Sequence, residues 1–176
     1  MHEYEFTLKF KFSDVSVNPD IYLDDLAQAG CDDALIGIGQ QGRIALNFNR
    51  EADSALNALC SAIEQVKSVI PKAQLIEATP DLVGLSDIAE VMGYSRQNMR
   101  QLMLNNQASF PLPVHEGSSA IWHLASVLDW LKESKSYAID DSLRDLARAT
   151  MQLNLSKEAL KLDPVINEKF TIALRA

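Results

Sequence analysis

Large apolar residues alternate with polar ones at the beginning of the chain. Tyr4, Phe6, Leu8, Phe10 and Phe12 are each separated by one polar residue. In an extended chain, this period of two places all five side chains on one face. The segment is therefore predicted to be a strand with one buried side.

Helical spacing follows this strand. Asn18 and Pro19 together are a typical helix start, and Gly30 is a typical helix end. The apolar residues at helical spacing between them are Leu23, Leu26 and Ala27. A first helix is predicted here.

The sequence GIGQQG, from Gly37 to Gly42, is similar to the glycine-rich loop that holds the phosphates of a dinucleotide. Such a loop must open a helix, because the phosphates bind free N–H groups at a helix N-terminus. Residues 43–48 instead alternate between apolar and polar, which is typical of a strand. Glycine between two strands favours a hairpin turn over a nucleotide site.

An amphipathic helix is predicted next, with Asn49 as its N-cap and Pro71 just after its end. Its apolar stripe comprises Leu56, Leu59, Cys60, Ile63, Val66 and Ile70. Residues 73–78 then read as a short strand. The order βαββαβ over residues 3–78 is that of the ferredoxin-like fold, an antiparallel sheet with two helices on one face.

The fold of this first part does not define a function, because ferredoxin-like domains serve many. Residues 1–80 are expected to form a ferredoxin-like domain that dimerises, docks a partner protein or binds a small effector. A purely structural module is an equally open alternative.

Two short helices joined by a glycine turn are predicted from Leu85 onward. Ser86 is expected to cap the first helix, Gly93 to make the turn and Ser95 to cap the second helix. The residues expected to be buried where the helices cross are Ile88, Ala89, Val91, Met92, Tyr94, Met99, Leu102 and Met103. This is the pattern of a helix-turn-helix.

The outer face of the second helix carries the residue types that read DNA. Its outward residues are Arg96, Gln97, Asn98, Arg100 and Gln101. Arginine pairs with guanine or phosphate, and Asn and Gln make two hydrogen bonds to adenine. The free N–H groups near Ser95 also suit a phosphate. The alternative is a helical hairpin of the core with a merely polar outside.

A short hairpin and another helix, over residues 108–133, follow the second helix. Two prolines flank the first extended piece, a Gly-Ser turn comes next, and a helix is predicted to begin near Ser126. The segment supplies, in order, Phe110, Pro111, Pro113, Gly117, Trp122, Val127, Trp130 and Leu131. In this pattern residues 83–133 resemble the winged helix-turn-helix of the MerR superfamily, especially AlpA-type phage regulators and excisionase-like proteins.

The resemblance implies a winged helix-turn-helix DNA-binding domain over residues 82–134. Wings of this family usually carry Lys or Arg around the glycine turn, whereas this chain has His115, Glu116, Ser118 and Ser119 there. The DNA contacts expected from the helix and the wing together are Ser95, Arg96, Gln97, Asn98, Arg100, Gln101, His115, Ser118 and Ser119.

Residues 139–176 are predicted to form a helical C-terminal segment. Asp140 or Asp141 is expected to cap the first helix, in which Leu143, Leu146, Ala147, Thr150 and Met151 recur at helical spacing. A further helical stretch precedes Pro164, and a short helix follows it. We expect this segment to pack back on the winged domain or across a dimer. An arm that binds and neutralises a partner protein is the alternative.

Charge is distributed unevenly along the chain. The net charge is −8, with −6 in residues 1–80, −2 in residues 81–135 and 0 in residues 136–176. Only two arginines lie on the predicted reading face, so one copy should bind DNA weakly. We therefore expect a homodimer on a repeated site.

Composition limits the classes of protein to which the chain can belong. The chain of 176 residues is 47% hydrophobic, yet it has no apolar run near the ~20 residues of a membrane span and no signal-peptide pattern. A cytoplasmic protein without membrane contact is expected. Cys31 and Cys60 lack CxxC spacing and are expected to be buried thiols rather than metal ligands.

Nothing in the sequence indicates an enzyme. His115 and His123 lack a catalytic or metal-binding partner and are expected at the surface, with His123 as a possible phosphate contact. Trp122 and Trp130 are expected to be core residues rather than base-stacking ones. Neither a P-loop nor an HExxH motif occurs, so no cofactor or metal is expected.

These observations favour a sequence-specific, DNA-binding transcriptional regulator of bacterial or prophage type. It is expected to bind double-stranded DNA as a dimer. The alternative is an antitoxin-like protein that inhibits a toxin-like partner and autoregulates its operon.

Overall fold

The alternating segment at the beginning of the chain forms β1 (His2–Lys11), a central strand of the sheet. In the computed structural model, which describes residues 1–37 and 40–175, β1 lies between β3 (Arg43–Ala52) and β4 (Gln74–Thr79). β2 (Ala34–Gly37) pairs with the other side of β3. The chain is thus α+β, as expected, with a four-stranded antiparallel sheet of order β2-β3-β1-β4.

The register of the sheet places the large apolar residues on one face. Phe6 lies opposite Phe48, with ring centroids 5.1 Å apart, and Leu8 lies between Leu46 and Ala78. All five are buried. They form the centre of what we call the first core.

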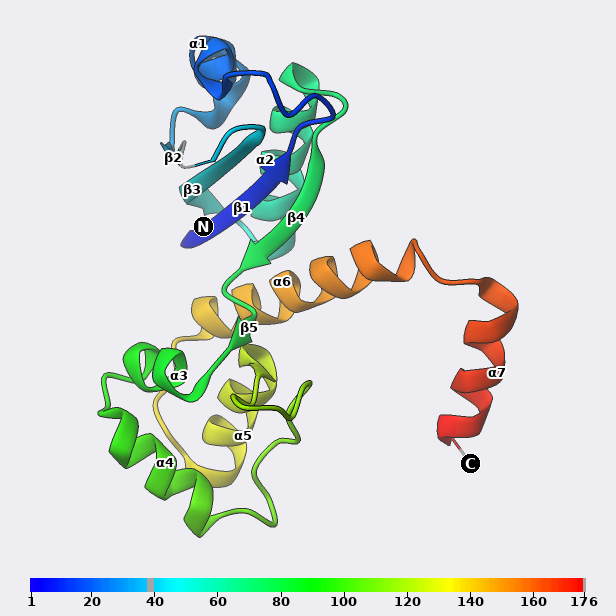
Figure 1. Cartoon of the computed structure of the whole chain (residues 1–176). Helices are drawn as coiled ribbons and strands as arrows, with labels where there is room; N and C mark the ends of the chain where they lie inside the picture. The colour runs from blue at the N-terminus through cyan, green and yellow to red at the C-terminus, as the bar shows by residue number, and fades with distance from the viewer. Residues whose placement is uncertain (38–39, 176) are drawn as a thin grey trace.

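Helical segments cover the apolar face of the sheet (Figure 1). They are the short run of η1 (Pro19–Tyr22), α1 (Leu23–Leu26) and η2 (Ala27–Cys31), followed later by α2 (Ala55–Val69). The side chain of Asn18 accepts a hydrogen bond from the N–H of Asp20, and Gly30 has a φ of 101°. The predicted start and end of the first helix are therefore confirmed.

The predicted N-cap at Asn49 is wrong. Asn49 lies within β3, and Ser54 caps α2 instead, accepting from the N–H of Asn57 at 3.2 Å. The strand continues because β3 stays paired with β1 as far as Ala52, which lies opposite His2. Within this extension the buried Arg50 donates to both carboxylate oxygens of Asp33, at 2.7 and 2.8 Å.

Two residues of the predicted apolar stripe of α2 do not face the core. Leu56 and Cys60, both predicted to be buried, are exposed. Cys31 is buried, as expected. The α2 residues in the first core include three alanines, which allow a close approach to the sheet: Ala55, Ala58, Leu59, Ala62 and Val66.

The glycine-rich stretch connects two antiparallel strands. Gly37 pairs with Ala45 across β2 and β3, as the predicted hairpin requires, and Gly42 has a φ of 72°. A strand rather than a helix follows Gly42. Ile38 and Gly39, in the middle of the predicted turn, lie outside the described residues.

A second core forms from residues 82–131. Its elements are β5 (Leu82–Val83), α3 (Leu85–Val91), α4 (Arg96–Asn105), β6 (Trp122–His123) and α5 (Leu124–Lys135), with β5 and β6 antiparallel. The largest side chains buried in the second core are Ile88, Met99, Phe110, Trp122, Leu124, Leu128, Trp130 and Leu131. The prediction that both tryptophans are core residues is confirmed.

Two helix starts in this part differ from the prediction. Ser86 lies inside α3, whose N-cap is Gly84, and the N–H of Gly84 donates to the Asp87 carboxylate at 2.7 Å. α5 begins at Leu124 rather than near Ser126, because the N–H of Leu124 donates to the Asp81 carbonyl and so fixes the chain there.

The long helix α6 (Asp141–Ala159) packs against both cores (Figure 1). Leu146 belongs to the first core and its neighbour Ala147 to the second. Asp140 caps the helix by accepting from the N–H of Ser142 at 2.9 Å. The division of the chain into three domains stays a prediction.

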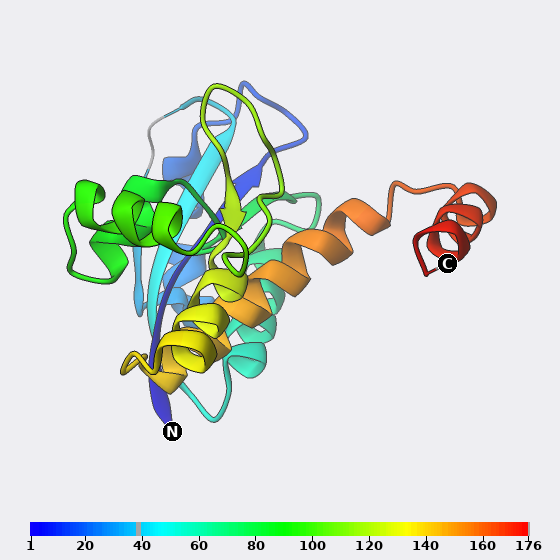
Figure 2. The ribbon, with the colours of Figure 1, turned by 90° about the horizontal axis from the view of Figure 1, so that it is seen from below.

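The last helix, α7 (Pro164–Arg175), extends away from the rest of the chain in both views (Figures 1 and 2). None of its described residues is buried. α6 packs back on the second core, as one form of the expectation requires. α7 does not pack on the described part of its own chain, and its packing across a dimer stays a prediction. Among the described helices, none combines the length and the apolarity that a membrane crossing requires.

Candidate nucleic-acid interface

A left-handed glycine separates α3 from α4. Gly93 has a φ of 66°, a region that residues with a Cβ rarely adopt. The turn is closed by the N–H of Tyr94, which donates to the Ala89 carbonyl at 2.7 Å. Ala89 is buried, so the two helices approach closely there, as the helix-turn-helix pattern predicts.

The first turn of α4 is fixed by a cap. Ser95 has an extended backbone, and its hydroxyl accepts from the N–H of Asn98 at 3.1 Å. The predicted cap at Ser95 is therefore confirmed. Tyr94, just before it, is partly exposed and packs edge-on against Tyr137 with ring centroids 6.0 Å apart.

The inner face of α4 holds the helix against the second core. Met99 is fully buried, and Leu102 and Met103 are half-buried against the same cluster. The side-chain amide of Asn106 donates to the Leu102 carbonyl at 2.7 Å and ties down the end of the helix. These contacts fix which side of α4 faces outward.

The outer face of α4 is polar and exposed. Its exposed residues are Arg96, Gln97, Asn98, Arg100 and Gln101. Within the described part of the chain, neither arginine takes part in an ion pair. The side-chain amide of Gln101 donates to the Asn105 side chain at 2.8 Å.

The other cations of residues 81–135 already have partners. Lys132 binds the Asp141 carboxylate, and Lys135 Nζ lies 2.5 Å from Asn106 Oδ1 and 5.5 Å from the centroid of the Trp130 ring. Of the four cations in this segment, Arg96 and Arg100 are therefore the two that remain available to a phosphate or a base.

The segment after α4 forms a short hairpin. The N–H of Val114 donates to the Ile121 carbonyl at 2.7 Å, and the N–H of Ile121 donates to the His115 carbonyl at 3.0 Å. The indole N–H of Trp122 donates to the Pro111 carbonyl at 3.0 Å and anchors the base of the hairpin. At the tip His115, Ser118 and Ser119 are exposed.

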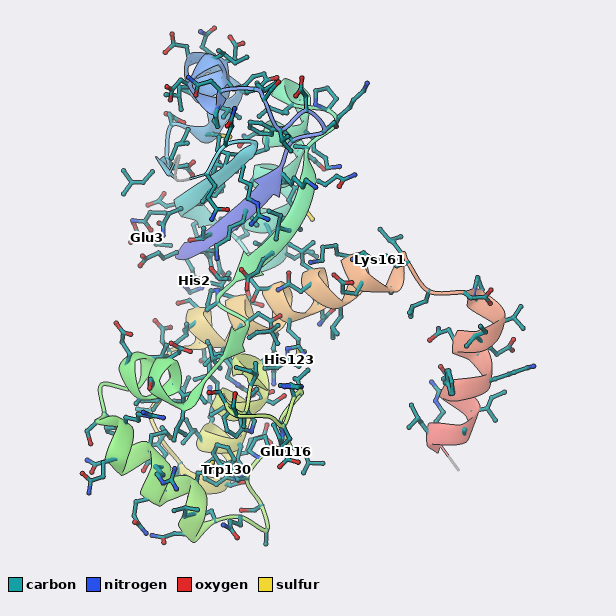
Figure 3. All side chains as sticks on the ribbon, in the orientation of Figure 1. His2, Glu3, Glu116, His123, Trp130 and Lys161 are labelled. Carbon is teal, nitrogen blue, oxygen red and sulfur yellow. The ribbon has the colours of Figure 1, made fainter. Side chains whose placement is uncertain are left out.

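The predicted DNA-contacting residues thus fall into two groups. Ser95 to Gln101 lie together on α4, whereas His115, Ser118 and Ser119 lie on the separate hairpin. Figure 3 places Glu116 on this hairpin, to the right of α5, with α4 at the lower left. The hairpin tip carries no arginine or lysine.

His123 is not the surface residue that the sequence predicted. Its side chain is only 17% exposed, and its Nδ1 lies 2.6 Å from Oδ1 of Asp81, which is 1% exposed. The Asn154 amide donates to the other carboxylate oxygen of Asp81 at 2.8 Å. These residues come from three distant parts of the chain, and no local sequence pattern connects them.

Comparison of the chain with protein-family models, with curated proteins and with solved structures finds no match. The resemblance of residues 83–133 to MerR-type and AlpA-type proteins therefore remains a prediction, and the case for a function depends on the geometry of α4.

Proposed function

We propose that the protein is a sequence-specific DNA-binding transcriptional regulator of bacterial or prophage type that places α4 in the major groove of double-stranded DNA. The observation that carries the proposal is the outer face of α4. It combines two arginines without ion-pair partners among the described residues with exposed Gln97, Asn98 and Gln101. Side chains of these three types form the most specific hydrogen bonds to base edges.

The arrangement around α4 supports a winged helix-turn-helix. Two short helices meet at Gly93, and a hairpin and a further helix follow in the order that the MerR-like pattern requires. In this proposal His115, Ser118 and Ser119 contact the sugar-phosphate backbone as neutral hydrogen-bonding groups. Such contacts position the protein without reading sequence.

The first part of the chain supports a ferredoxin-like module. Its βαββαβ element order and its strand order β2-β3-β1-β4 are those of that fold. In the proposed regulator this module contributes to assembly or senses an effector, while α4 makes the contacts to DNA.

The proposal is tested by selecting binding sites from a library of randomised DNA duplexes with the full chain. The wild-type protein should enrich one short site. The double variant Arg96→Ala, Arg100→Ala should lose binding to that site by about 30-fold or more, because bidentate arginine contacts are each worth about 1–3 kcal/mol.

A matched control removes the same charge elsewhere. The variant Lys67→Ala, Lys72→Ala deletes two exposed cations of the first part of the chain and should bind the selected site as the wild type does. Equal loss in both variants, or unchanged binding in the arginine variant, would show that α4 is not the reading helix.

The second candidate is the antitoxin-like inhibitor, and the exposed apolar side of α7 favours it. It predicts that the protein forms a stable 1:1 complex with a toxin-like product of an adjacent gene. The complex should be lost when α7 is deleted. If no such complex forms on co-expression, this candidate fails while the DNA-binding proposal stands.

A further inference from the structure

The helix α7 presents an apolar side that nothing in the described chain covers. Ile166, Phe170 and Ala173 recur at i, i+4 and i+7 and are all exposed, with Phe170 at 65%. Val165 and Ile172 lie together on one side of this stripe and are also exposed. We call residues 164–175 the arm.

An ordered turn joins α6 to the arm. Asp163 accepts from the N–H groups of Val165 and Ile166 at 2.9 and 3.1 Å, so it caps the arm. On the other side of the turn, the N–H of Leu162 donates to the Ala159 carbonyl at 3.1 Å. In two perpendicular views the arm projects past the end of α6 (Figures 1 and 2).

The same chain carries an uncovered apolar groove between α2 and α6. Its volume is about 420 Å³. Leu56 and Cys60 on α2 are exposed along one side, and Ile63, Ala149 and Leu153 complete the apolar lining. The rim is polar and includes Arg148 and Gln152. Helical grooves of this kind receive the apolar side of an amphipathic helix.

The arm and the groove match in length. The apolar stripe of the arm runs from Ile166 to Ala173, and the exposed stripe of α2 runs from Leu56 to Ile63. Each spans seven residue steps, or about 10 Å of helix. The charged residues that line the groove, Asp145 and Arg148, balance one another, and the arm carries two cations and one carboxylate, so charge does not oppose the contact.

We infer that two copies of this chain form a dimer by exchanging arms, with α7 of each copy in the α2–α6 groove of the other. A buried Val, Leu, Ile or Phe side chain removes roughly 60–120 Å² of apolar surface from water. Four such side chains of the arm and three in the groove then bury roughly 420–840 Å² per contact. One contact lies below the ~1,200–2,000 Å² of a stable interface, and the reciprocal pair, at roughly 840–1,680 Å², reaches into that range.

The inference deepens the proposed function and rests on it. A dimer would bring two copies of α4 to the DNA, and together they would supply the affinity for DNA that the two arginines of one copy do not. Its test is independent of DNA. The oligomeric state of the full chain is measured by sedimentation velocity in the absence of DNA. The wild type should sediment as a dimer of about 39 kDa, twice the 19.5 kDa of the chain.

Substitutions at exposed positions test each half of the contact without disturbing a core. Ile166→Glu with Phe170→Glu on the arm, and separately Leu56→Glu in the groove, should each weaken dimerisation by roughly 100-fold, as for central interface residues. Two controls introduce the same charge outside the contact. Asn167→Glu on the polar side of α7 and Leu35→Glu on β2 should remain dimeric.

Mixing the two defective variants distinguishes exchange from a symmetric packing of arm on arm. In a mixture, the intact arm of the Leu56→Glu chain can still enter the intact groove of the arm variant. The mixture should therefore associate more tightly than either variant alone. If the mixture behaves as the two variants do separately, the arm does not bind this groove.

The exposed Cys60 provides a covalent test of the partner. An Ala173→Cys variant, oxidised with glutathione disulfide, should form a disulfide-linked dimer on a non-reducing gel, and Asn167→Cys should not. A linked monomer would show that the arm folds onto its own chain. A monomeric wild type, or a dimer that persists in the arm and groove variants, would also overturn the inference. Loss of DNA binding by a dimeric Arg96→Ala, Arg100→Ala variant would bear on the proposed function alone.

Discussion

The side-chain amide of Asn154 pairs with the backbone of Ala78 as a neighbouring strand would. Asn154 Oδ1 accepts from the N–H of Ala78 at 2.9 Å, and its Nδ2 donates to the carbonyl of the same residue at 2.7 Å. Lys157, one turn further along α6, donates to the Ile76 carbonyl. Helix α6 therefore covers an edge of the sheet that would otherwise expose unpaired backbone groups.

We expect Asn154→Leu to lower the free energy of unfolding by about 2–5 kcal/mol, because it leaves both backbone groups of the buried Ala78 without partners. Urea denaturation followed by circular dichroism measures the change. Asn167→Leu, a similar substitution on the exposed side of α7, should change it by less than about 0.5 kcal/mol. A loss below about 1 kcal/mol for Asn154→Leu would mean that water replaces the amide.

Substitution of Gly93 should strain the turn between α3 and α4. The backbone of Gly93 has a φ of 66°, and a Cβ added there would meet no atom within 4 Å. The cost of Gly93→Ala is therefore that of the left-handed backbone alone, about 1–2 kcal/mol. Differential scanning calorimetry should show a melting temperature lower by a few degrees. Gly93→Asn should cost less, because asparagine tolerates this region.

Gly37→Ala is the control for this prediction. Gly37 lies at the end of β2, is not among the glycines with a positive φ, and an added Cβ would be in ordinary contact with the Ala45 carbonyl oxygen at 3.8 Å. Its melting temperature should stay within about one degree of the wild type. If the two alanine variants have the same melting temperature, the role of Gly93 is not to allow the left-handed backbone of the turn.

The ion pairs of Asp129 should make stability depend on pH in the acid range. Burial of Asp129 acts to raise its pKa. The guanidinium groups of Arg144 and Arg148, 2.6 and 2.8 Å away, outweigh burial and hold the pKa below its ordinary value of 3.8. A pKa lowered by folding contributes stability above 3.8, and that contribution is lost as pH falls through the lower folded value.

Asp129→Asn should accordingly be less stable than the wild type at pH 7. The difference should shrink as the pH falls from about 4 to 2, where the wild-type carboxylate becomes protonated too. Urea denaturation at a series of pH values measures this convergence. For Glu116→Gln, at the exposed tip of the hairpin, the free energy of unfolding should depend on pH in the same way as for the wild type. A constant difference for Asp129→Asn across this range would contradict the assignment.

Salt dependence separates phosphate contacts from base contacts on α4. If Arg100 or Arg96 neutralises a phosphate, its replacement by alanine should reduce the slope of log K against log salt concentration by about 0.9. Fluorescence anisotropy with the selected duplex between about 50 and 200 mM salt measures the slope. Gln97→Ala should leave the slope unchanged and relax the choice of one base pair. An unchanged slope in both arginine variants would indicate that they contact bases only.

Short-range patterns predicted much of this structure. The alternation in β1 and the outward face of α4 follow from the period of the element alone, so both could be read from the sequence. The caps at Asn18 and Ser95 are equally local, since each side chain binds a backbone group within three residues.

Contacts between distant residues account for the failures. The start of α2 could not be predicted because pairing with the distant strand β1 carries β3 past Asn49 to Ala52. The burial of His123 depends on Asp81, which lies 42 positions away. The amphipathic pattern of α7 correctly indicated a helix, but periodicity does not reveal what its apolar side contacts.

Leu146 and Ala147 are consecutive, yet each contributes to a different core. Helix α6 therefore completes both cores. A protease cut or an excision between residues 80 and 139 would separate one core from the helix that completes it. Heating should melt both parts in one cooperative transition, and a fragment that ends before α6 should fold poorly on its own. A change at the sheet, such as the binding of a ligand, would be transmitted toward α4 through helix α6, which both cores share, rather than through a flexible linker.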